Sequence, residues 1–470
     1  MELWRHGAGE LARMIAAGEV SCREVVDSNL ERIEAVNGHL NAITIVLAEE
    51  ARAAADAADR AEGPRGPLHG VPFTVKENID LAGTATTQGL VALAEAVAPV
   101  DAPVVERMRA AGAIPIGRTN LPDLGLRIHT DSSLRGLTRN PWDPGVTAGG
   151  SSGGEASALA SGMSPIGLGN DVGGSLRNPA HCCGIASIKP TAGRVPHASV
   201  IPPEDWGPAM QAMCVEGVMA RRVADVRLGL EIVNGFDPRD PQSVAAPLEL
   251  ERPARRVAVL AEPPGGDTHP EIAAAVRRAA DALADAGYDV AEAVPPDYET
   301  ALEVWGRWLF ADIGAQEELL RTVMGPDGVR FLDLTSPHFP PADTAGIFAA
   351  VMDRRRIHRA WSAFLADRPL ILSPIWTQPP FPHGWDIESE DTALATMRLM
   401  RPVMPANLLG LPAAAVPAGT AAGLPVGVQV MAERFHDLAA LEAAEAIESA
   451  LGVQTPIDPV ARARETSLSG

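Results

Sequence analysis

From about residue 65 onward, short apolar runs alternate with helix-like segments, and glycine- and proline-rich turns separate them. An alternation of strands and helices packs into layers of helices against a sheet, so the pattern predicts an α/β architecture. No low-complexity linker divides the chain, and we expect one large domain over residues 1–470. The first apolar runs occupy 70–75, 113–117 and 166–169, with helix-like stretches at 104–111 and 155–161.

Other helices and strands are predicted on either side of this region. Ser21 to Glu24 has the capping-box pattern, apolar residues follow at helical spacing, and Asn37-Gly38 predicts the end of that helix. The alanine-rich segment 48–62 predicts a second, amphipathic helix. Later in the chain we expect strands at 257–260, 289–293, 413–416 and 427–431, and helices at 270–286 and 438–451.

The charge and the apolar segments exclude several classes of protein. The formal net charge is −21, and no basic stripe is visible, which speaks against a nucleic-acid partner. The uncharged stretch 402–432 contains five prolines, so it predicts short buried strands and not a membrane-spanning helix. The N-terminus has no apolar leader, and we expect a cytoplasmic protein without a membrane partner.

Cysteines and lysines are both rare in this chain. Cys22, Cys182, Cys183 and Cys214 have no paired spacing for a metal, so we expect no metal site and a reducing compartment. The 39 basic residues comprise 37 arginines and two lysines, Lys76 and Lys189. Burial can make a lysine neutral, whereas arginine stays charged, so a retained lysine is a candidate base. Genome composition is the alternative explanation.

Two glycine–serine clusters, at 149–154 and 171–175, are the candidate sites of chemistry. Each could be a flexible turn. A phosphate-binding P-loop requires lysine after the last glycine, but Glu155 stands there and would repel phosphate. A nucleophile elbow would place Ser152 at its centre, but a loop and not a strand precedes it. Its triad would need a histidine such as His358, His383 or His436.

Three separate motifs carry a resemblance to a known family. The runs GVPFTVKENID (70–80), TRNPWDPGVTAGGSSGGEASALASG (138–162) and NDVGGSLRNPAHCCGIASIKPTAGRV (170–195) resemble the amidase signature family. The likeness covers most of the chain and is strongest over about 65–225. It implies a single amidase domain with a mixed β-sheet covered by helices on both faces.

The resemblance also implies a catalytic group. Ser175 would be the nucleophile, Ser151 the bridging serine after a cis peptide bond, and Lys76 the base. A serine hydroxyl needs a neighbour to remove its proton, and a neutral lysine can do so. A second hydroxyl can relay that proton because it both donates and accepts.

Further residues in and beyond these motifs are candidates for the site. The N–H groups of Val172, Gly173 and Gly174 would form an oxyanion hole, and Ser152, Asp171 and Arg177 would support the loops. Gly125, Asn170 and Trp376 are the candidate substrate contacts, and Asn170 stands where the family usually has a small hydroxyl residue. Lys189 matches a structural position. No cofactor is implied.

The expected function is therefore hydrolysis of a small-molecule amide through a serine acyl-enzyme. Esters and carbamates (urethanes) present an attackable carbonyl to the same triad. Aromatic residues between 300 and 390 favour an apolar or aromatic group in the substrate. The alternative is an amidotransferase A-type subunit, which would release ammonia from glutamine within a complex. A non-catalytic protein is disfavoured because all three triad residues are present. Family resemblance makes a homodimer plausible.

Overall fold

An eleven-stranded mixed sheet runs through the molecule in the computed structural model, which describes residues 2–62, 65–339 and 343–460. Its strands, in spatial order, are β1 (Ile43–Val46), β3 (Ile114–Thr119), β2 (Pro72–Lys76), β6 (Ile166–Asp171), β8 (Val215–Ala220), β7 (Ala186–Lys189), β12 (Ala413–Ala421), β13 (Leu424–Ala432), β11 (Leu370–Pro374), β9 (Arg256–Val259) and β10 (Asp289–Glu292). A separate short hairpin joins β4 (Asp131–Ser132) and β5 (Gly136–Leu137). The predicted α/β class is confirmed.

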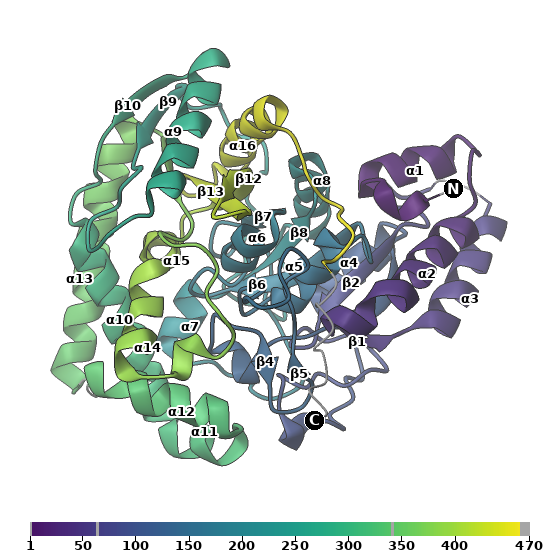
Figure 1. Ribbon diagram of the computed structural model, residues 1–470, viewed down its shortest axis with the longest axis horizontal. Coiled ribbons are helices and arrows are strands. Elements are labelled where there is room, and N and C mark those ends of the chain that lie inside the picture. Colours follow the sequence, from purple (N-terminus) through teal and green to yellow (C-terminus); the bar gives the residue numbers. More distant parts are fainter. Residues whose placement is uncertain (1, 63–64, 340–342, 461–470) are drawn as a thin grey trace, which may run out of the picture.

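Helices cover both faces of this sheet. The first core holds side chains from α1 (Ala8–Ala16), α2 (Cys22–Leu40), α3 (Ala48–Arg60), α4 (Pro103–Ala110), α8 (Val223–Val233), α9 (Pro270–Asp285) and α16 (Asp437–Leu451). The second holds side chains from α5 (Gly153–Ala160), α6 (Arg177–Cys183), α7 (Pro208–Met213), α10 (Tyr298–Ala315), α12 (Pro326–Thr335), α13 (Thr344–Asp367), α14 (Glu390–Leu399) and α15 (Met404–Leu409). A further helix, α11 (Glu317–Val323), lies beside α12, and α1 to α3 lie at the opposite end of the molecule (Figure 1).

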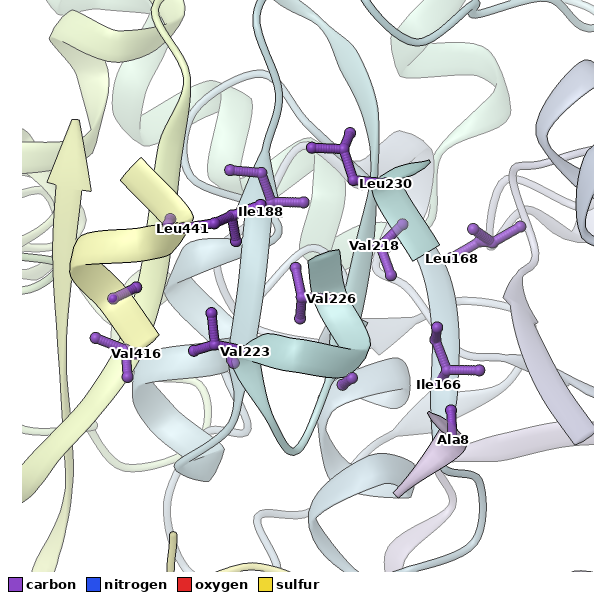
Figure 2. Close-up of a cluster of buried hydrophobic side chains, with 14 of the residues drawn as sticks. Ala8, Ile166, Leu168, Ile188, Val218, Val223, Val226, Leu230, Val416 and Leu441 are labelled. Atoms are coloured by element: carbon purple, nitrogen blue, oxygen red, sulfur yellow. The ribbon is translucent and has the colours of Figure 1, made fainter. Parts of the chain in front are cut away.

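The strands contribute to both cores by alternation. In β12, Ala414 and Val416 belong to the first core, whereas Ala413 and Ala415 belong to the second. Successive side chains of a strand point to opposite faces, so both faces of the central sheet are buried. Figure 2 shows the first core, where strand residues pack against α8 and α16: Ile188, Val218 and Val416 against Val223, Val226, Leu230 and Leu441.

Most predicted elements are present, with two differences. The first helix does not end at Asn37-Gly38, because α2 continues to Leu40 and Asn41 adopts the left-handed conformation. The side chain of Asn37 instead accepts hydrogen bonds from the N–H groups of Ala42 and Ile43, and so stabilises the turn after the helix. The segment 402–432 contains the predicted strands, but α15 precedes them. No helix among the described residues combines the length and the apolar character that crossing a membrane requires.

The sheet topology brings two strand ends together. β2 and β6 are neighbours and parallel, so their carboxyl ends lie at one edge of the sheet. Lys76 ends β2 and Asp171 ends β6, and Ser175 follows four residues later. The 149–154 cluster runs into the first turn of α5, which begins at Gly153. Residues far apart in the sequence are thus presented to one region.

Candidate active site

Lys76 is fully buried and contacts two polar side chains. Its Nζ donates to Ser151 Oγ at 2.7 Å and to Asn170 Oδ1 at 2.7 Å. Burial lowers the pKa of Lys76 to about 8, an effect that the negative charge of Glu216 partly opposes. A lysine with this pKa is partly neutral near pH 8, so Lys76 can accept a proton in that range.

Ser151 follows a cis peptide bond, Gly150–Ser151, as the motif resemblance implies. Its surroundings leave little room. A Cβ on Gly150 would lie 2.7 Å from the Arg127 carbonyl oxygen, and a Cβ on Gly125 would lie 3.1 Å from Ser151 Oγ. Glycine at both positions therefore allows the backbone to pack closely around the Ser151 hydroxyl.

Ser175 lies in the neighbouring loop and lines a cavity. Its carbonyl oxygen accepts a hydrogen bond of 3.2 Å from the Ser152 N–H, which joins the two serine loops. The Ser152 hydroxyl is fully buried and has no hydrogen-bond partner among the residues described. Ser152 thus contacts the Ser175 loop through its main chain, and its hydroxyl lacks the histidine contact that a nucleophile elbow would need.

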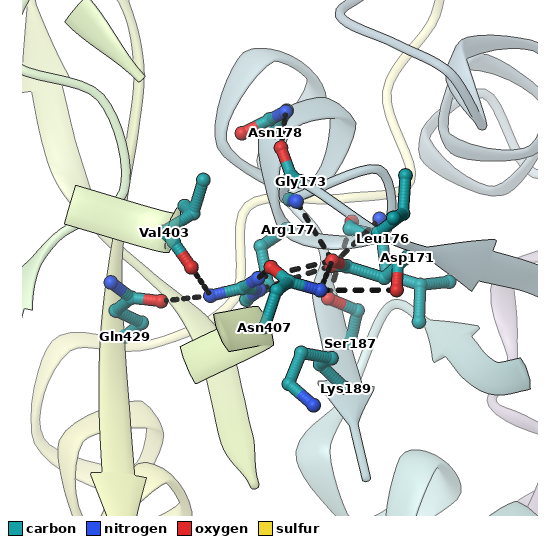
Figure 3. A network of polar contacts seen from close by, with 12 residues as sticks. Asp171, Gly173, Leu176, Arg177, Asn178, Ser187, Lys189, Val403, Asn407 and Gln429 are labelled. Carbon is teal, nitrogen blue, oxygen red and sulfur yellow. Dashed lines mark hydrogen bonds and ion pairs between the residues drawn. The ribbon is translucent and has the colours of Figure 1, made fainter. Parts of the chain in front are cut away.

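A buried network holds the loop that carries Ser175 (Figure 3). Arg177 donates to both Asp171 carboxylate oxygens, each at 3.0 Å. Its remaining donors bond Val403 O, Gln429 Oε1 and Asn407 Oδ1, so all five guanidinium N–H groups are used. Burial opposes ionisation of Asp171, but the charge and hydrogen bonds of Arg177 outweigh it and lower the pKa of Asp171 to about 2.

The same carboxylate changes the predicted oxyanion hole. The Gly174 N–H donates to Asp171 Oδ1 at 2.7 Å, so this group is already occupied. The N–H groups of Val172, Gly173 and Ser175 have no acceptor within the described part of the chain. Two of the three predicted donors therefore remain available, and the N–H of Ser175 itself is a third.

Trp305 of α10 shapes the wall beside these donors. Its Nε1 donates to the Val172 carbonyl oxygen at 3.1 Å. A Cβ on Gly173 would lie 2.7 Å from Trp305 Cζ2, so only glycine lets the indole pack this closely. Trp305 therefore both orders the loop and forms part of the cavity that Ser175 enters.

The cavity beside Ser175 has a largely apolar lining. Among the described residues in its wall, the one cationic side chain is Arg127, which forms a bidentate ion pair with Asp386 at 2.8 and 3.0 Å. Its charge is thus already compensated. The large apolar side chains that line the cavity include Met210, Trp305, Phe310, Phe331, Met397 and Met400.

The three predicted substrate contacts have different positions. Gly125 lines the cavity, but Asn170 and Trp376 do not. Asn170 Oδ1 accepts the hydrogen bond from Lys76 Nζ. Trp376 is fully buried, and its Nε1 donates to Asn178 Oδ1 at 2.9 Å. Trp376 is a candidate in the sequence because it follows a strand, whereas Trp305 lies within a helix, where an aromatic residue resembles ordinary core.

Lys189 is buried apart from the serines. Its Nζ donates to the Pro190 carbonyl oxygen at 2.9 Å, and burial lowers its pKa to about 7. Arg177 and Asp171, which belong to the network of Figure 3, are among the charged groups that act on Lys189. Lys189 makes no hydrogen bond to the hydroxyl of Ser151 or Ser175. This agrees with the structural, non-catalytic role expected for Lys189.

Comparisons relate the whole chain to known proteins. The family model described as Amidase matches residues 24–441. The chain is 41% identical to an indoleacetamide hydrolase of Bradyrhizobium diazoefficiens, covering 96% of this chain and 87% of the relative. It is 34% identical to the A-type subunit of the glutamyl-tRNA(Gln) amidotransferase of Deinococcus radiodurans, covering 95% and 98%. The structure of 6-aminohexanoate cyclic dimer hydrolase complexed with substrate matches with a TM-score of 0.82 at 30% identity, covering 96% and 98%.

Proposed function

The chain belongs to the amidase signature family and is an amide hydrolase acting on C–N bonds other than peptide bonds; from this premise we propose a Ser–cis-Ser–Lys mechanism. Ser175 is the nucleophile, Ser151 the bridge and Lys76 the base. The contact of 2.7 Å between Lys76 Nζ and Ser151 Oγ carries this proposal, because it joins a buried base to the serine loops.

The first half-reaction forms an acyl-enzyme. Neutral Lys76 takes the proton of the Ser151 hydroxyl as Ser151 takes the proton of Ser175. The Ser175 oxygen attacks the amide carbonyl, and the free N–H groups of Val172, Gly173 and Ser175 donate to the oxyanion. Ser151 then donates a proton to the departing nitrogen and recovers one from Lys76. The C–N bond breaks, and the acyl group stays on Ser175.

The second half-reaction releases the acid. Water attacks the acyl carbonyl while Ser151 and Lys76 take its proton, and the same N–H groups stabilise the second oxyanion. The proton returns to the Ser175 oxygen as the ester bond breaks. Lys76 is again neutral, and the products are a carboxylic acid and an amine or ammonia.

Covalent trapping tests the nucleophile. A fluorophosphonate is expected to modify Ser175, because this serine both enters the cavity and lies beside the oxyanion donors. The intact chain is labelled and then digested, and mass spectrometry of its peptides identifies the modified residue. Ser152→Ala is the matched control and should still be labelled, whereas Ser175→Ala should not. Labelling of Ser152 in the wild type, or no labelling of a folded and active sample, would contradict the mechanism.

The cavity supports amides of apolar, aromatic acids as substrates. Burial of an apolar substrate group against the Trp, Phe and Met side chains of the lining is favourable. The arginine in the cavity wall is already paired with Asp386, so it does not call for an acidic substrate. The name of the relative with 41% identity, indoleacetamide hydrolase, points to the same chemical class. We therefore propose an arylacetamide substrate.

A substrate panel tests this assignment. We expect kcat/KM to be highest for indole-3-acetamide or a similar arylacetamide, lower for a short aliphatic amide, and lowest for a dicarboxylic monoamide. Trp305→Ala should lower kcat/KM for the aryl substrate more than kcat/KM for the aliphatic one, because the indole forms part of the cavity wall. An equal loss for both would argue against binding of the aryl group there. The panel also includes an aryl ester and a carbamate.

Glutamine belongs in the same panel because of the amidotransferase alternative. A glutamine substrate carries two charges, and the described cavity offers only the paired Arg127 to meet them. Turnover of arylacetamides by the chain alone would support a stand-alone hydrolase. Turnover confined to glutamine would favour the A-type subunit.

The four cysteines are free thiols, which supports a reducing compartment such as the cytoplasm. A homodimer stays a prediction.

A further inference from the structure

Glu216 of β8 is a buried carboxyl group that the mechanism above does not use. The residue is 3% exposed, and its Oε2 has no hydrogen-bond partner in the residues that the structure describes. Burying a carboxyl oxygen without a partner is costly, and such groups gather at functional sites. The position of Glu216 near Lys76 explains why an energetically unfavourable buried carboxyl group is present here.

Strand register places Glu216 next to the partner of Lys76. β6 and β8 pair antiparallel, and Glu216 lies directly opposite Asn170. Residues directly opposite in such a pair project from the same face of the sheet. Asn170 Oδ1 in turn accepts the hydrogen bond of 2.7 Å from Lys76 Nζ. Glu216 is thus separated from the base by one amide side chain.

The other acidic groups that face Lys76 are Cys214, Asp171 and Glu155. Asp171 is committed to Arg177, and Glu155 accepts hydrogen bonds from the hydroxyls of Thr74 and Thr119. Burial raises the pKa of the Cys214 thiol, which keeps it neutral. Glu216 is therefore the carboxyl group near Lys76, within the described chain, that retains an unpartnered oxygen.

The groups that face Glu216 itself are few. Besides Lys76 and Asn170 they are Asp80, His197 and the neutral thiol of Cys214. His197 Nε2 lies 3.6 Å from Glu216 Oε1, and burial lowers the pKa of this imidazole, so it is a weak source of positive charge. Asp80 accepts hydrogen bonds from Ser199 and Val200. Lys76 is thus the main cation available to Glu216.

Resting on the proposed function, we propose that Glu216 is a positioning residue for the base: across Asn170, its carboxylate offsets the positive charge that Lys76 acquires when it takes the proton of Ser151. An ammonium group in a buried site is expensive without a counter-charge. Burial raises the pKa of Glu216, whereas the positive charge of Lys76 lowers it, so protonation of Lys76 favours the ionised carboxylate of Glu216. Because the two groups interact, the midpoint of the acidic limb belongs to the pair and not to Lys76 alone.

The test compares pH profiles of kcat/KM for one amide substrate. In Glu216→Gln the midpoint of the acidic limb should fall by about one pH unit or more, because removing a nearby negative charge lowers the pKa of an ammonium group. Glu216→Leu should give the same shift, and it serves if the glutamine variant does not fold. Glu216→Asp, which restores the carboxylate, should move the midpoint back toward the wild-type value.

Asp225→Asn is the matched control for this experiment. Asp225 is also a buried carboxyl, but it accepts from the Gly9 N–H at the start of α1 and does not face Lys76. Its profile should keep the wild-type midpoint. If both Glu216→Gln and Glu216→Leu keep that midpoint, the proposal for Glu216 is overturned. If instead Lys76→Arg remains active, the proposed mechanism itself fails, so the two failures are distinguishable.

Discussion

Replacing Lys76 with arginine is expected to lower kcat/KM for an amide substrate by about 10²- to 10⁴-fold, the usual contribution of general acid–base catalysis. Arginine preserves the positive charge but cannot give up its proton in the working pH range, so it cannot accept one from Ser151. The hydrogen bond of 2.7 Å to Ser151 Oγ would then come from a permanent cation. Oxyanion donors account for the activity that remains.

The pH profile separates this explanation from a merely structural one. Lys76 works as a base only when neutral, so wild-type kcat/KM should rise as pH increases through about 8. His129 and His181 cannot produce that limb, because burial lowers their pKa values to about 3 and 4. Lys189 is the matched control: Lys189→Arg should retain far more activity and the same limb. Near-native activity of Lys76→Arg would require a different base.

Arg177→Met should cause the largest loss of stability among single substitutions near the site, about 3–5 kcal/mol in the free energy of unfolding. The change removes five hydrogen bonds and leaves Asp171 as a buried charge without its cation. Activity should fall as well, because Asp171 also accepts from the N–H groups of Gly174 and Leu176 on both sides of Ser175.

Urea unfolding followed by circular dichroism measures this effect, with Arg321→Met as the control. Arg321 also pairs with carboxylates, Glu317 and Asp333, but its side chain is 35% exposed, so its loss should cost at most about 1 kcal/mol. The folded-state pKa of Asp171 lies below its ordinary value. In the wild type its contribution is therefore present above about pH 4 and is lost as pH falls toward 2. Equal losses for both arginines would contradict the assigned role of the network.

Local patterns predicted much of the fold, and the resemblance of three motifs to a known family supplied the three proposed catalytic positions. Short apolar runs between turns predicted strands such as β2 and β6, because a strand buried on both faces has such a run. Lys76, Ser151 and Ser175 each lie within a continuous motif whose glycines serve local backbone geometry. The prediction of the end of α2 erred by three residues, because Asn37 stabilises a turn with its side chain instead of ending the helix.

The tertiary structure decided which of these groups meet. The sequence contains Trp305 and Trp376 alike, but only the packing of α10 against the 172–175 loop makes Trp305 a wall of the cavity. The motif resemblance implied three oxyanion donors, yet in the folded chain the Gly174 N–H donates to Asp171 instead. The register of β6 with β8 brings Glu216 to Asn170. Periodicity shows that a side chain is buried but not which distant residue it contacts, because strand register and the packing of distant helices determine that contact.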